Sequence, residues 1–286
     1  MEIKENEHQL VSNIQKQLKC KVIKVVGRGG QGLVLLVALE ASPNNRAVVK
    51  VATKEGAASK SMSVEIMAQR KLTKEDTMQC DFLPIHHTVR GSFKDDYLLM
   101  HYYPISIWDW IHLAELPLSI LKLQMTMIAR AVSYCHARGI AHCDIKPTNI
   151  MLGEDLVPVL IDFGMAHIDG HSTGHSGGTK QYLPPEMYKE RYKDTNVNLR
   201  SADSWSLGIT FYAMLFKSYP FKPATNWPEL EELPVISFKK HTTCRVSREL
   251  VGSELEAAKS LILGLLSFSP STRLTAGDAS RHSWFE

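Results

Sequence analysis

The first hundred residues contain short runs of apolar residues, many of which are β-branched, and clusters of turn-forming residues separate these runs. Runs of this kind predict β-strands. They are Val22 to Val26, Leu33 to Ala38, Arg46 to Val51, Leu83 to Val89 and Tyr97 to His101. The Ser42-Pro43-Asn44-Asn45 stretch predicts a turn before the third strand.

Three other segments show the three-and-four spacing of apolar residues that is typical of helices. Leu10, Val11, Ile14 and Leu18 predict a short amphipathic helix near the start, either an N-terminal extension or a packing element. A second helix is predicted between Ala57 and Leu72. A third, long and apolar enough to be buried, begins at Ser119 and ends before Gly139.

The composition is that of an ordinary globular protein of 286 residues, with 44% hydrophobic and 22% charged residues. A formal charge of +3 is too small to indicate nucleic acid or a membrane surface as a partner. The start is polar and resembles no secretory signal, and the longest apolar runs are too short to span a bilayer. We therefore expect a cytoplasmic or nuclear protein without membrane insertion.

Cysteine usage agrees with a reducing compartment. The chain has five cysteines, an odd number, without a C-x-x-C pair: Cys20, Cys80, Cys135, Cys143 and Cys244. This pattern argues against a zinc site and against a disulfide framework.

A glycine-rich stretch separates the first two predicted strands. It reads Gly27-Arg28-Gly29-Gly30-Gln31-Gly32. Without Cβ atoms, such a backbone can approach a polyphosphate closely and direct its N–H groups at it. The same G-x-G-x-x-G spacing occurs in dinucleotide-binding βαβ units, but there a helix follows and here a strand follows, with Val34 two residues after Gly32.

Two later stretches bring together residues suited to phosphoryl transfer. They are His142-Cys143-Asp144-Ile145-Lys146-Pro147-Thr148-Asn149 and Leu160-Ile161-Asp162-Phe163-Gly164. Asp144 would accept or orient a hydroxyl proton, and Lys146 would place a positive charge near the transferring group. Asn149 and Asp162 offer the hard oxygen ligands that Mg²⁺ prefers.

These stretches resemble the H-R-D-x-K-x-x-N catalytic loop and the D-F-G triplet of eukaryotic protein kinases, with Cys143 in place of the usual arginine. The glycine stretch with Val34 is similar to the kinase G-x-G-x-x-G-x-V loop. The resemblance covers about residues 22–285. It implies an α+β fold of two lobes, a small antiparallel sheet with one main helix and a larger, mostly helical lobe.

The resemblance implies a division into an N-terminal extension over residues 1–21, a nucleotide-binding lobe over 22–103 and a catalytic lobe over 104–286. Lys50 lies 23 residues after Gly27 and matches the strand lysine of V-A-I-K, with Val48 replacing the alanine near the adenine. Glu65, 15 residues further on, is its expected partner, and the pair would hold the α and β phosphates. Glu55 and Glu75 are less well placed alternatives.

By position in the family, several more residues are expected at the adenine. Met100 would line the back of the pocket, the hinge would run over His101, Tyr102 and Tyr103, and Met151 would lie under the ring. Ser106 and Asp109 are alternative contacts for the ribose.

Further along, Gly178 to Glu186 is similar to the G-T-x-x-Y-x-A-P-E segment, with Pro184 for the alanine. The resemblance implies an ion pair between Glu186 and Arg273. It also implies that Asp203, in the D-x-W-S-x-G stretch, braces the catalytic loop.

The expected activity is transfer of the γ-phosphoryl group of ATP, with Mg²⁺, to serine or threonine of a protein substrate. Lys146 and Thr179 resemble the serine/threonine branch. A pseudokinase acting as a nucleotide-binding scaffold is the first alternative, although Lys50, Asp144 and Asp162 are all present. A small-molecule kinase is the second, and it would be expected to lack the segment from Gly178 to Glu186.

The replacement of arginine by Cys143 bears on regulation. In relatives with arginine there, the guanidinium pairs with a phosphate on the activation segment. Cysteine cannot pair with a phosphate in this way. His175 stands where the phosphorylated threonine often lies in this family. Ser172, Thr173 and Ser176 remain as phosphosites, with Lys180 or Arg191 as a basic partner. We expect the segment to be ordered by its own packing or by a regulatory partner.

Overall fold

The structure, a computed structural model, divides into two compact units. The first comprises residues 1–75 and 84–103, and the second comprises residues 76–83 and 104–286. The residues described are 2–29, 32–40, 42–52, 57–73, 86–90, 96–113, 115–171, 178–187, 197–221, 234–238 and 249–286.

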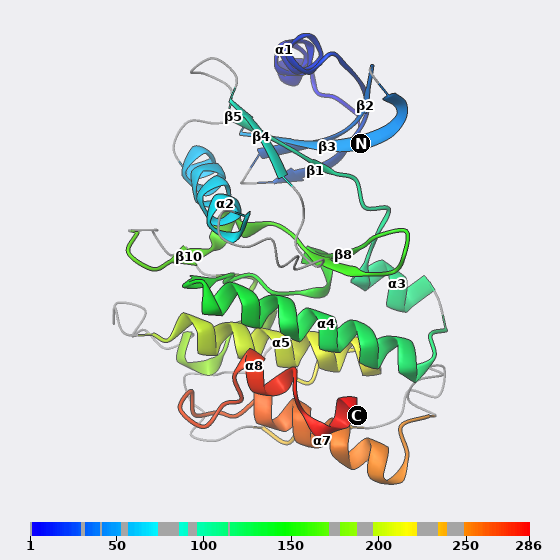
Figure 1. The fold of residues 1–286 in the computed structure, drawn as a ribbon, viewed down its shortest axis with the longest axis vertical. Helices are drawn as coiled ribbons and strands as arrows, with labels where there is room; N and C mark the ends of the chain where they lie inside the picture. Colours follow the sequence, from blue (N-terminus) through cyan, green and yellow to red (C-terminus); the bar gives the residue numbers. More distant parts are fainter. Residues whose placement is uncertain are drawn as a thin grey trace. The chain divides into compact units, whose positions relative to one another are not determined.

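The first unit is built on an antiparallel five-stranded sheet with strand order β1-β2-β3-β5-β4 (Figure 1). The strands are β1 (Cys20–Gly29), β2 (Gly32–Leu39), β3 (Ser42–Val51), β4 (His86–Arg90) and β5 (Asp96–His101). Two helices accompany them, α1 (His8–Leu18) and α2 (Ala57–Thr73). All seven elements were predicted from the sequence, with small differences in their ends.

One of these differences is a correction. The sequence predicted a turn over residues 42–45, but the structure places these residues in β3. Ala38 pairs with Arg46 and Leu39 with Ser42, so three residues of β3 have no opposite partner in β2. Pro43 falls in this bulge, where its missing N–H costs no ladder hydrogen bond. The bulge therefore accommodates the residues that suggested a turn.

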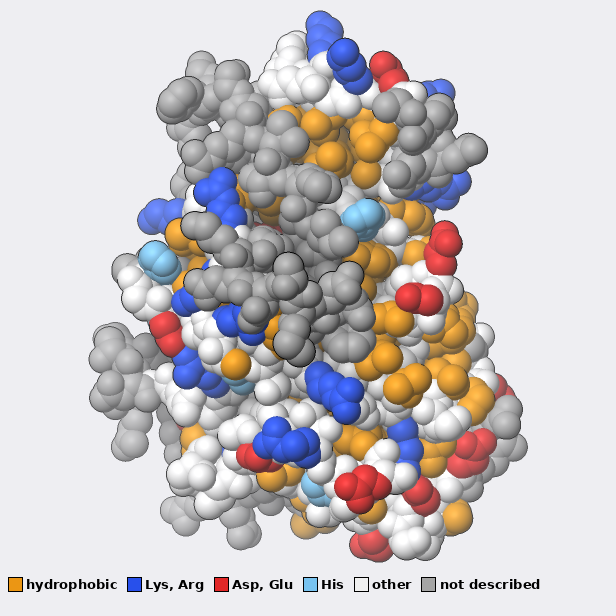
Figure 2. Space-filling view, in the orientation of Figure 1, with side chains coloured by type: hydrophobic (Ala, Val, Ile, Leu, Met, Phe, Trp, Pro, Cys, Tyr) orange, Lys and Arg blue, Asp and Glu red, His pale blue; other side chains and the backbone are white. Residues whose placement is uncertain are grey.

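Helix α1 is part of the first unit's core. Val11 and Ile14, three residues apart on one helix face, are 4% and 0% exposed and pack with Val25, Leu35 and Tyr97 of the sheet. The other face is polar, and Figure 2 shows basic and polar side chains at the top of the view, where Figure 1 places α1. Lys19, in a left-handed conformation, ends the helix and leads into β1.

Helix α2 covers another part of the sheet. Met62 and Ile66, one turn apart, are buried against Leu98 of β5, and Met100 packs against the same cluster. This contact places Glu65, which lies beside Ile66 in sequence, next to β3.

The second unit is mostly helical, as expected for the α+β class. Its helices are α3 (Ile107–Leu113), α4 (Leu118–Ala137), α5 (Leu199–Phe216), α7 (Gly252–Leu265) and α8 (Ala276–Ala279). Its strands are short: β6 (Ile105–Ser106), β7 (Ile140–Ala141), β8 (Ile150–Leu152), β9 (Pro158–Leu160) and β10 (His167–Ile168). Two small sheets, β6-β8-β9 and β7-β10, carry the loops between α4 and α5.

Helix α5 is the centre of this unit. It lies between α4 and α7 (Figure 1), and every residue from Ala202 to Phe216 is buried. A helix buried all round is sequestered on every side by other elements. Gly208 permits the close packing of α7, since a Cβ there would lie 2.9 Å from Leu265. The polar side chains of α5 within residues 202–216 therefore contact other parts of the second unit and not the solvent.

Within the residues that the structure describes, no helix combines the length and the apolar character needed to cross a membrane.

We predict that Ile14→Ala lowers the free energy of unfolding of the first unit by about 2–5 kcal/mol, because it leaves a cavity between α1 and the sheet. Urea denaturation measures the change. Gln17→Ala, on the exposed face of the same helix, is the matched control and should change it by less than about 0.5 kcal/mol. Equal stabilities of the Ile14 variant and the parent would contradict the packing of α1 on the sheet.

Candidate active site

The turn that leads to Asp144 is held by a buried carboxylate from α5. Asp203 accepts hydrogen bonds from the backbone N–H of His142 at 2.7 Å and of Cys143 at 2.8 Å. A ring nitrogen of His136 lies 2.9 Å from the same carboxylate. Held in this way, Cys143 has a φ of 64°, a left-handed conformation that is uncommon for residues other than glycine. Asp203 therefore braces the backbone of the loop that leads to Asp144, as the sequence resemblance implied.

Asp144 is the acceptor for several donors from nearby loops. Its Oδ2 accepts from Lys146 Nζ at 2.7 Å and from Asn149 Nδ2 at 3.0 Å. Its Oδ1 accepts from the backbone N–H of Thr179 at 3.0 Å and from the Thr179 hydroxyl at 2.7 Å. Lys146 Nζ also donates to that hydroxyl, at 2.7 Å. The carboxylate is thus fixed in orientation, with both oxygens engaged.

The two candidate metal ligands lie on segments that are joined by backbone contacts. The N–H of Ile161, the residue before Asp162, donates to the carbonyl of Asn149 at 2.9 Å, and β8 pairs with β9 between them. Asn149 uses its amide nitrogen for Asp144, which leaves its amide oxygen as the atom suited to a cation. Asp162 has a φ of 66° and begins the turn Phe163–Met165. An amide and a carboxylate oxygen fit a hard cation such as Mg²⁺.

Phe163, the middle residue of the D-F-G triplet, anchors this segment. It is fully buried, and its ring meets the ring of His142 edge to face at 4.7 Å between centroids. His142 in turn has a ring nitrogen 3.0 Å from the carbonyl of Ile161. These contacts tie the segment before Asp162 to the turn before Asp144.

Cys143 has a packing role at this turn. Its thiol lies 3.6 Å from the carbonyl of Ala141, and burial, with the charge of Asp203 adding to it, raises the pKa of the thiol well above its ordinary value. The backbone carbonyl of Cys143 is packed against Gly178, where a Cβ would lie only 2.3 Å from the oxygen. Any larger residue at Gly178 would push the 178–187 segment away from Asp144.

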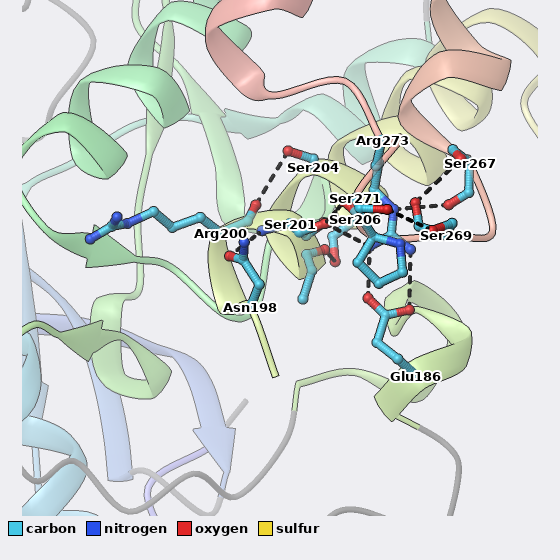
Figure 3. Close-up of polar contacts among 12 residues, drawn as sticks. Glu186, Asn198, Arg200, Ser201, Ser204, Ser206, Ser267, Ser269, Ser271 and Arg273 are labelled. Carbon is cyan, nitrogen blue, oxygen red and sulfur yellow. Dashed lines mark hydrogen bonds and ion pairs between the residues drawn. The ribbon is translucent and has the colours of Figure 1, made fainter. Parts of the chain in front are cut away.

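The described part of the activation segment is anchored to α5 and to the loop before α8. Ser206 donates to the carbonyl of Tyr182 at 2.7 Å. Glu186 and Arg273 face each other in Figure 3, joined by two hydrogen bonds of 2.8 and 3.1 Å. Arg273 also donates to the carbonyl of Ser201 at 2.9 Å. The ion pair expected from the sequence is confirmed.

In the first unit, Lys50 and Glu65 form an ion pair. Lys50 Nζ lies 2.6 Å from Glu65 Oε2, and their side chains are 7% and 0% exposed. Two charges so poorly solvated are stable only when each offsets the other. The alternatives Glu55 and Glu75 lie outside the described residues.

The sheet aligns other residues expected at a nucleotide. Val34 lies opposite Lys50, and Val48 lies opposite Met100 on the neighbouring strand. Gly27 lies opposite Val34 at the base of the glycine hairpin, whose residues Gly30 and Gln31 are outside the described part of the chain.

The residues expected at the hinge, under the adenine and at the ribose lie on several different elements. His101 ends β5, and Tyr102 and Tyr103 follow it, both half-buried. Met151 is half-buried on β8 of the second unit. The hydroxyl of Ser106 donates a hydrogen bond to Asp109 Oδ2 at 2.7 Å, so the two alternative ribose contacts bind each other.

Three residues that shape the site were not assigned to it from the sequence. Thr179 contacts Asp144 directly, His136 contacts Asp203, and Ser206 holds Tyr182. The G-T-x-x-Y pattern was a signal for Thr179. His136 had none, because it lies outside the recognised motifs and its partner is 67 residues away in the chain.

Comparison with known proteins identifies the family. The protein kinase domain family matches residues 20–285, and the chain belongs to it. It is 34% identical over 163 residues to human death-associated protein kinase 2 and 32% identical over 159 residues to an Aurora kinase of Saccharomyces cerevisiae. It is 32% identical over 160 residues to the protein kinase domain-containing protein ppk9 of Schizosaccharomyces pombe.

These alignments cover part of each protein. Each includes 55% of this chain, and they include 41%, 39% and 27% of the three relatives, in the same order. The chain therefore matches less than half the length of each.

We predict that Glu186→Gln lowers the free energy of unfolding by about 3 kcal/mol, because it leaves the buried Arg273 guanidinium without its carboxylate. Urea denaturation measures the change. Glu256→Gln, which breaks an exposed ion pair with Lys259, is the control and should cost less than about 1 kcal/mol. If both variants lost the same amount, the pair with Arg273 would not hold the segment.

Proposed function

We propose that this chain is an active protein kinase, transferring the γ-phosphoryl group of MgATP to serine or threonine hydroxyls of protein substrates. The observation that supports it most strongly is the set of donors that orient the Asp144 carboxylate, from Lys146, Asn149 and Thr179. A carboxylate held in this way is prepared for one geometry of proton transfer.

In this mechanism Asp144 accepts, or orients, the proton of the substrate hydroxyl as the hydroxyl oxygen attacks the γ-phosphorus atom of ATP. The bond between that phosphorus and the bridging oxygen breaks, and ADP leaves with the bridging oxygen. Lys146, bonded to Asp144, places its ammonium where negative charge develops on the transferred group. Because a phosphoryl transfer needs little covalent chemistry from the protein, positioning and charge carry most of the rate enhancement.

The nucleotide is bound by residues from other segments. The backbone of the glycine hairpin approaches the phosphates, and Lys50, aimed by Glu65, contacts the α and β phosphates. Val34, Val48 and Met100 of the sheet would contact the adenine, and residues 101–103 would recognise its edge. Family position also assigns Met151 of β8 to the adenine. Each of these roles follows from family position, and the strand register is compatible with those of Val34, Val48, Lys50 and Met100.

Asn149 and Asp162 would hold the metal ion. Mg²⁺, when bound with ATP, neutralises charge on the phosphates. The two residues are suited to it by their oxygen donors and by the backbone bond that links their segments.

The choice of serine or threonine rests on Lys146 and Thr179. They lie two and 35 residues after Asp144, in the pattern of the serine/threonine branch, and in the structure they contact each other at Asp144. The ordered segment 178–187, anchored by Glu186, supports a peptide substrate over a small molecule.

The decisive experiment incubates the chain with labelled ATP, Mg²⁺ and a degenerate peptide library. Asp144→Asn should reduce turnover by about a hundredfold or more while ATP binding stays near normal, because only the base is lost. Asp162→Asn should remove turnover and also weaken Mg²⁺-dependent nucleotide binding, because the charge that holds the metal is lost. Asp155→Asn, an exposed aspartate of the same unit, is the matched control.

Phosphoamino-acid analysis of the same products identifies the acceptor, and phosphoserine and phosphothreonine are expected. Mainly phosphotyrosine would overturn the serine/threonine assignment. A parent chain that binds ATP without transferring phosphate would establish the pseudokinase alternative. Transfer at the parent rate by both aspartate variants would refute the catalytic assignment.

A second prediction concerns regulation. The described part of the activation segment is held by Gly178, Thr179, Tyr182 and Glu186 through contacts that involve no phosphate. Ser172, Thr173, His175, Ser176 and Arg191 lie outside the described residues. We expect complete dephosphorylation to leave the initial rate within about twofold of the parent, since these contacts order the segment.

The dephosphorylated state is confirmed by mass spectrometry, and its initial rate is compared with that of the triple alanine variant of Ser172, Thr173 and Ser176. A loss of about a hundredfold or more, the effect of a missing transition-state element, would show that a phosphate clamp exists.

A further inference from the structure

The N-terminal segment contacts the glycine hairpin through one arginine. Arg28 lies in β1, between Gly27 and Gly29. Its Nε donates to Glu7 Oε1 at 2.8 Å and its Nη2 to Glu7 Oε2 at 2.7 Å. The same Nη2 donates to the carbonyl of Glu2 at 2.9 Å. Two parallel bonds of this kind fix the guanidinium in both distance and orientation.

Glu7 is itself held in place. It ends the turn Glu5–Glu7 that precedes α1, its residue is 7% exposed, and it accepts a further hydrogen bond from the N–H of Lys4 at 2.9 Å. The hydrogen bonds from Arg28 and from the Lys4 backbone lower the pKa of its carboxyl from 4.5 to about 2. The carboxylate is therefore charged at every pH at which the protein would be assayed.

The hairpin needs such a contact because of its glycines. Glycine leaves the backbone freer than any other residue, so Gly27, Gly29 and Gly32 weaken the base of the hairpin. On one side, Gly32 packs closely on β3, where a Cβ would lie 2.1 Å from the carbonyl of Val51, the residue after Lys50. On the other side, Arg28 is fixed by Glu7. The two contacts hold opposite strands of the hairpin.

The pairing also determines what Arg28 contributes. An arginine in a phosphate-binding loop suggests a contact with the phosphates. Here its charge is balanced by a carboxylate 2.7 Å away, so its contribution to the field at the phosphates is small. Arg28 would therefore affect nucleotide binding by fixing the position of the hairpin and not by its charge.

We propose that Glu7 is a positioning residue for nucleotide binding, which acts through Arg28 to hold Gly27 to Gly29, the β1 side of the glycine hairpin, in place. The N-terminal segment 2–18, anchored in the core by Ile14, thereby becomes part of the nucleotide site. The proposal rests on the proposed function, since it takes the nucleotide to be bound by this hairpin.

The test compares Glu7→Gln with Glu5→Gln, an exposed glutamate of the same turn. Glu7→Gln keeps the shape but loses the charge. We expect it to raise the KM and the Kd for ATP by about fivefold or more, the lower end of coupling between linked sites, with kcat at saturating ATP within about twofold. Glu5→Gln should change neither. Restoring the carboxylate with Glu7→Asp should recover part of the affinity.

A double-mutant cycle tests whether Glu7 acts through Arg28. In an Arg28→Ala background, Glu7→Gln should have no further effect on ATP affinity. Hydrogen exchange of the amides of residues 22–37, measured without nucleotide, should be faster in Glu7→Gln than in the parent. A merely structural role would lower the unfolding temperature without splitting KM from kcat.

Additive effects in the cycle, or unchanged ATP affinity and unchanged exchange in Glu7→Gln, would overturn the proposal. If Glu7→Gln does not fold, Arg28→Lys, which keeps the charge but loses the second bond, must show the same rise in KM. A parent chain that does not bind ATP would refute the proposed function instead. The exchange measurement would still decide whether Glu7 holds the hairpin.

Discussion

The carboxylate of Asp203 is the group on which the position of the proposed catalytic residue Asp144 depends. It is buried on α5, and it binds the N–H groups of His142 and Cys143 and contacts His136. The left-handed backbone of Cys143 costs roughly 1–3 kcal/mol for a residue with a side chain, and it persists only where the surroundings enforce it. These hydrogen bonds supply that enforcement, and the turn that results presents Asp144.

Helix α5 also orders the segment 178–187, the proposed substrate side of the unit, through hydrogen bonds from its side chains and backbone. Ser206 holds Tyr182, and Ser201 accepts from Arg273, which pairs with Glu186. Gly178 fits against the carbonyl of Cys143, so the turn that α5 fixes also determines where the segment lies. One buried helix thus places both Asp144 and Thr179. Cysteine is sufficient at position 143 because the turn uses its backbone, while its half-buried thiol lies beside the carbonyl of Ala141 and has a raised pKa.

Local patterns carried most of what the sequence could predict. Strands, helices and the two catalytic motifs depend on residues that are neighbours in the chain, and the family resemblance supplied the Glu186–Arg273 pair. The contacts that the sequence could not indicate join distant residues: Glu7 with Arg28, 21 apart, and His136 with Asp203, 67 apart. Which charged side chains become buried together in these contacts is decided by how the elements pack, and the local sequence pattern does not show it. The turn predicted at 42–45 was wrong because a β-bulge accepts Pro43 and Asn44 within a strand.

The most direct measurement is the kcat of Asp203→Asn at saturating ATP and peptide, with the Kd for ATP measured in parallel. An asparagine of the same shape offers one acceptor oxygen where the structure uses two, so one backbone bond to the turn is lost. The account predicts a folded protein with near-parent ATP affinity and a kcat reduced by about a hundredfold, the effect of displacing a catalytic group by about 1 Å. A folded variant with the parent kcat would contradict the claim that Asp203 positions Asp144.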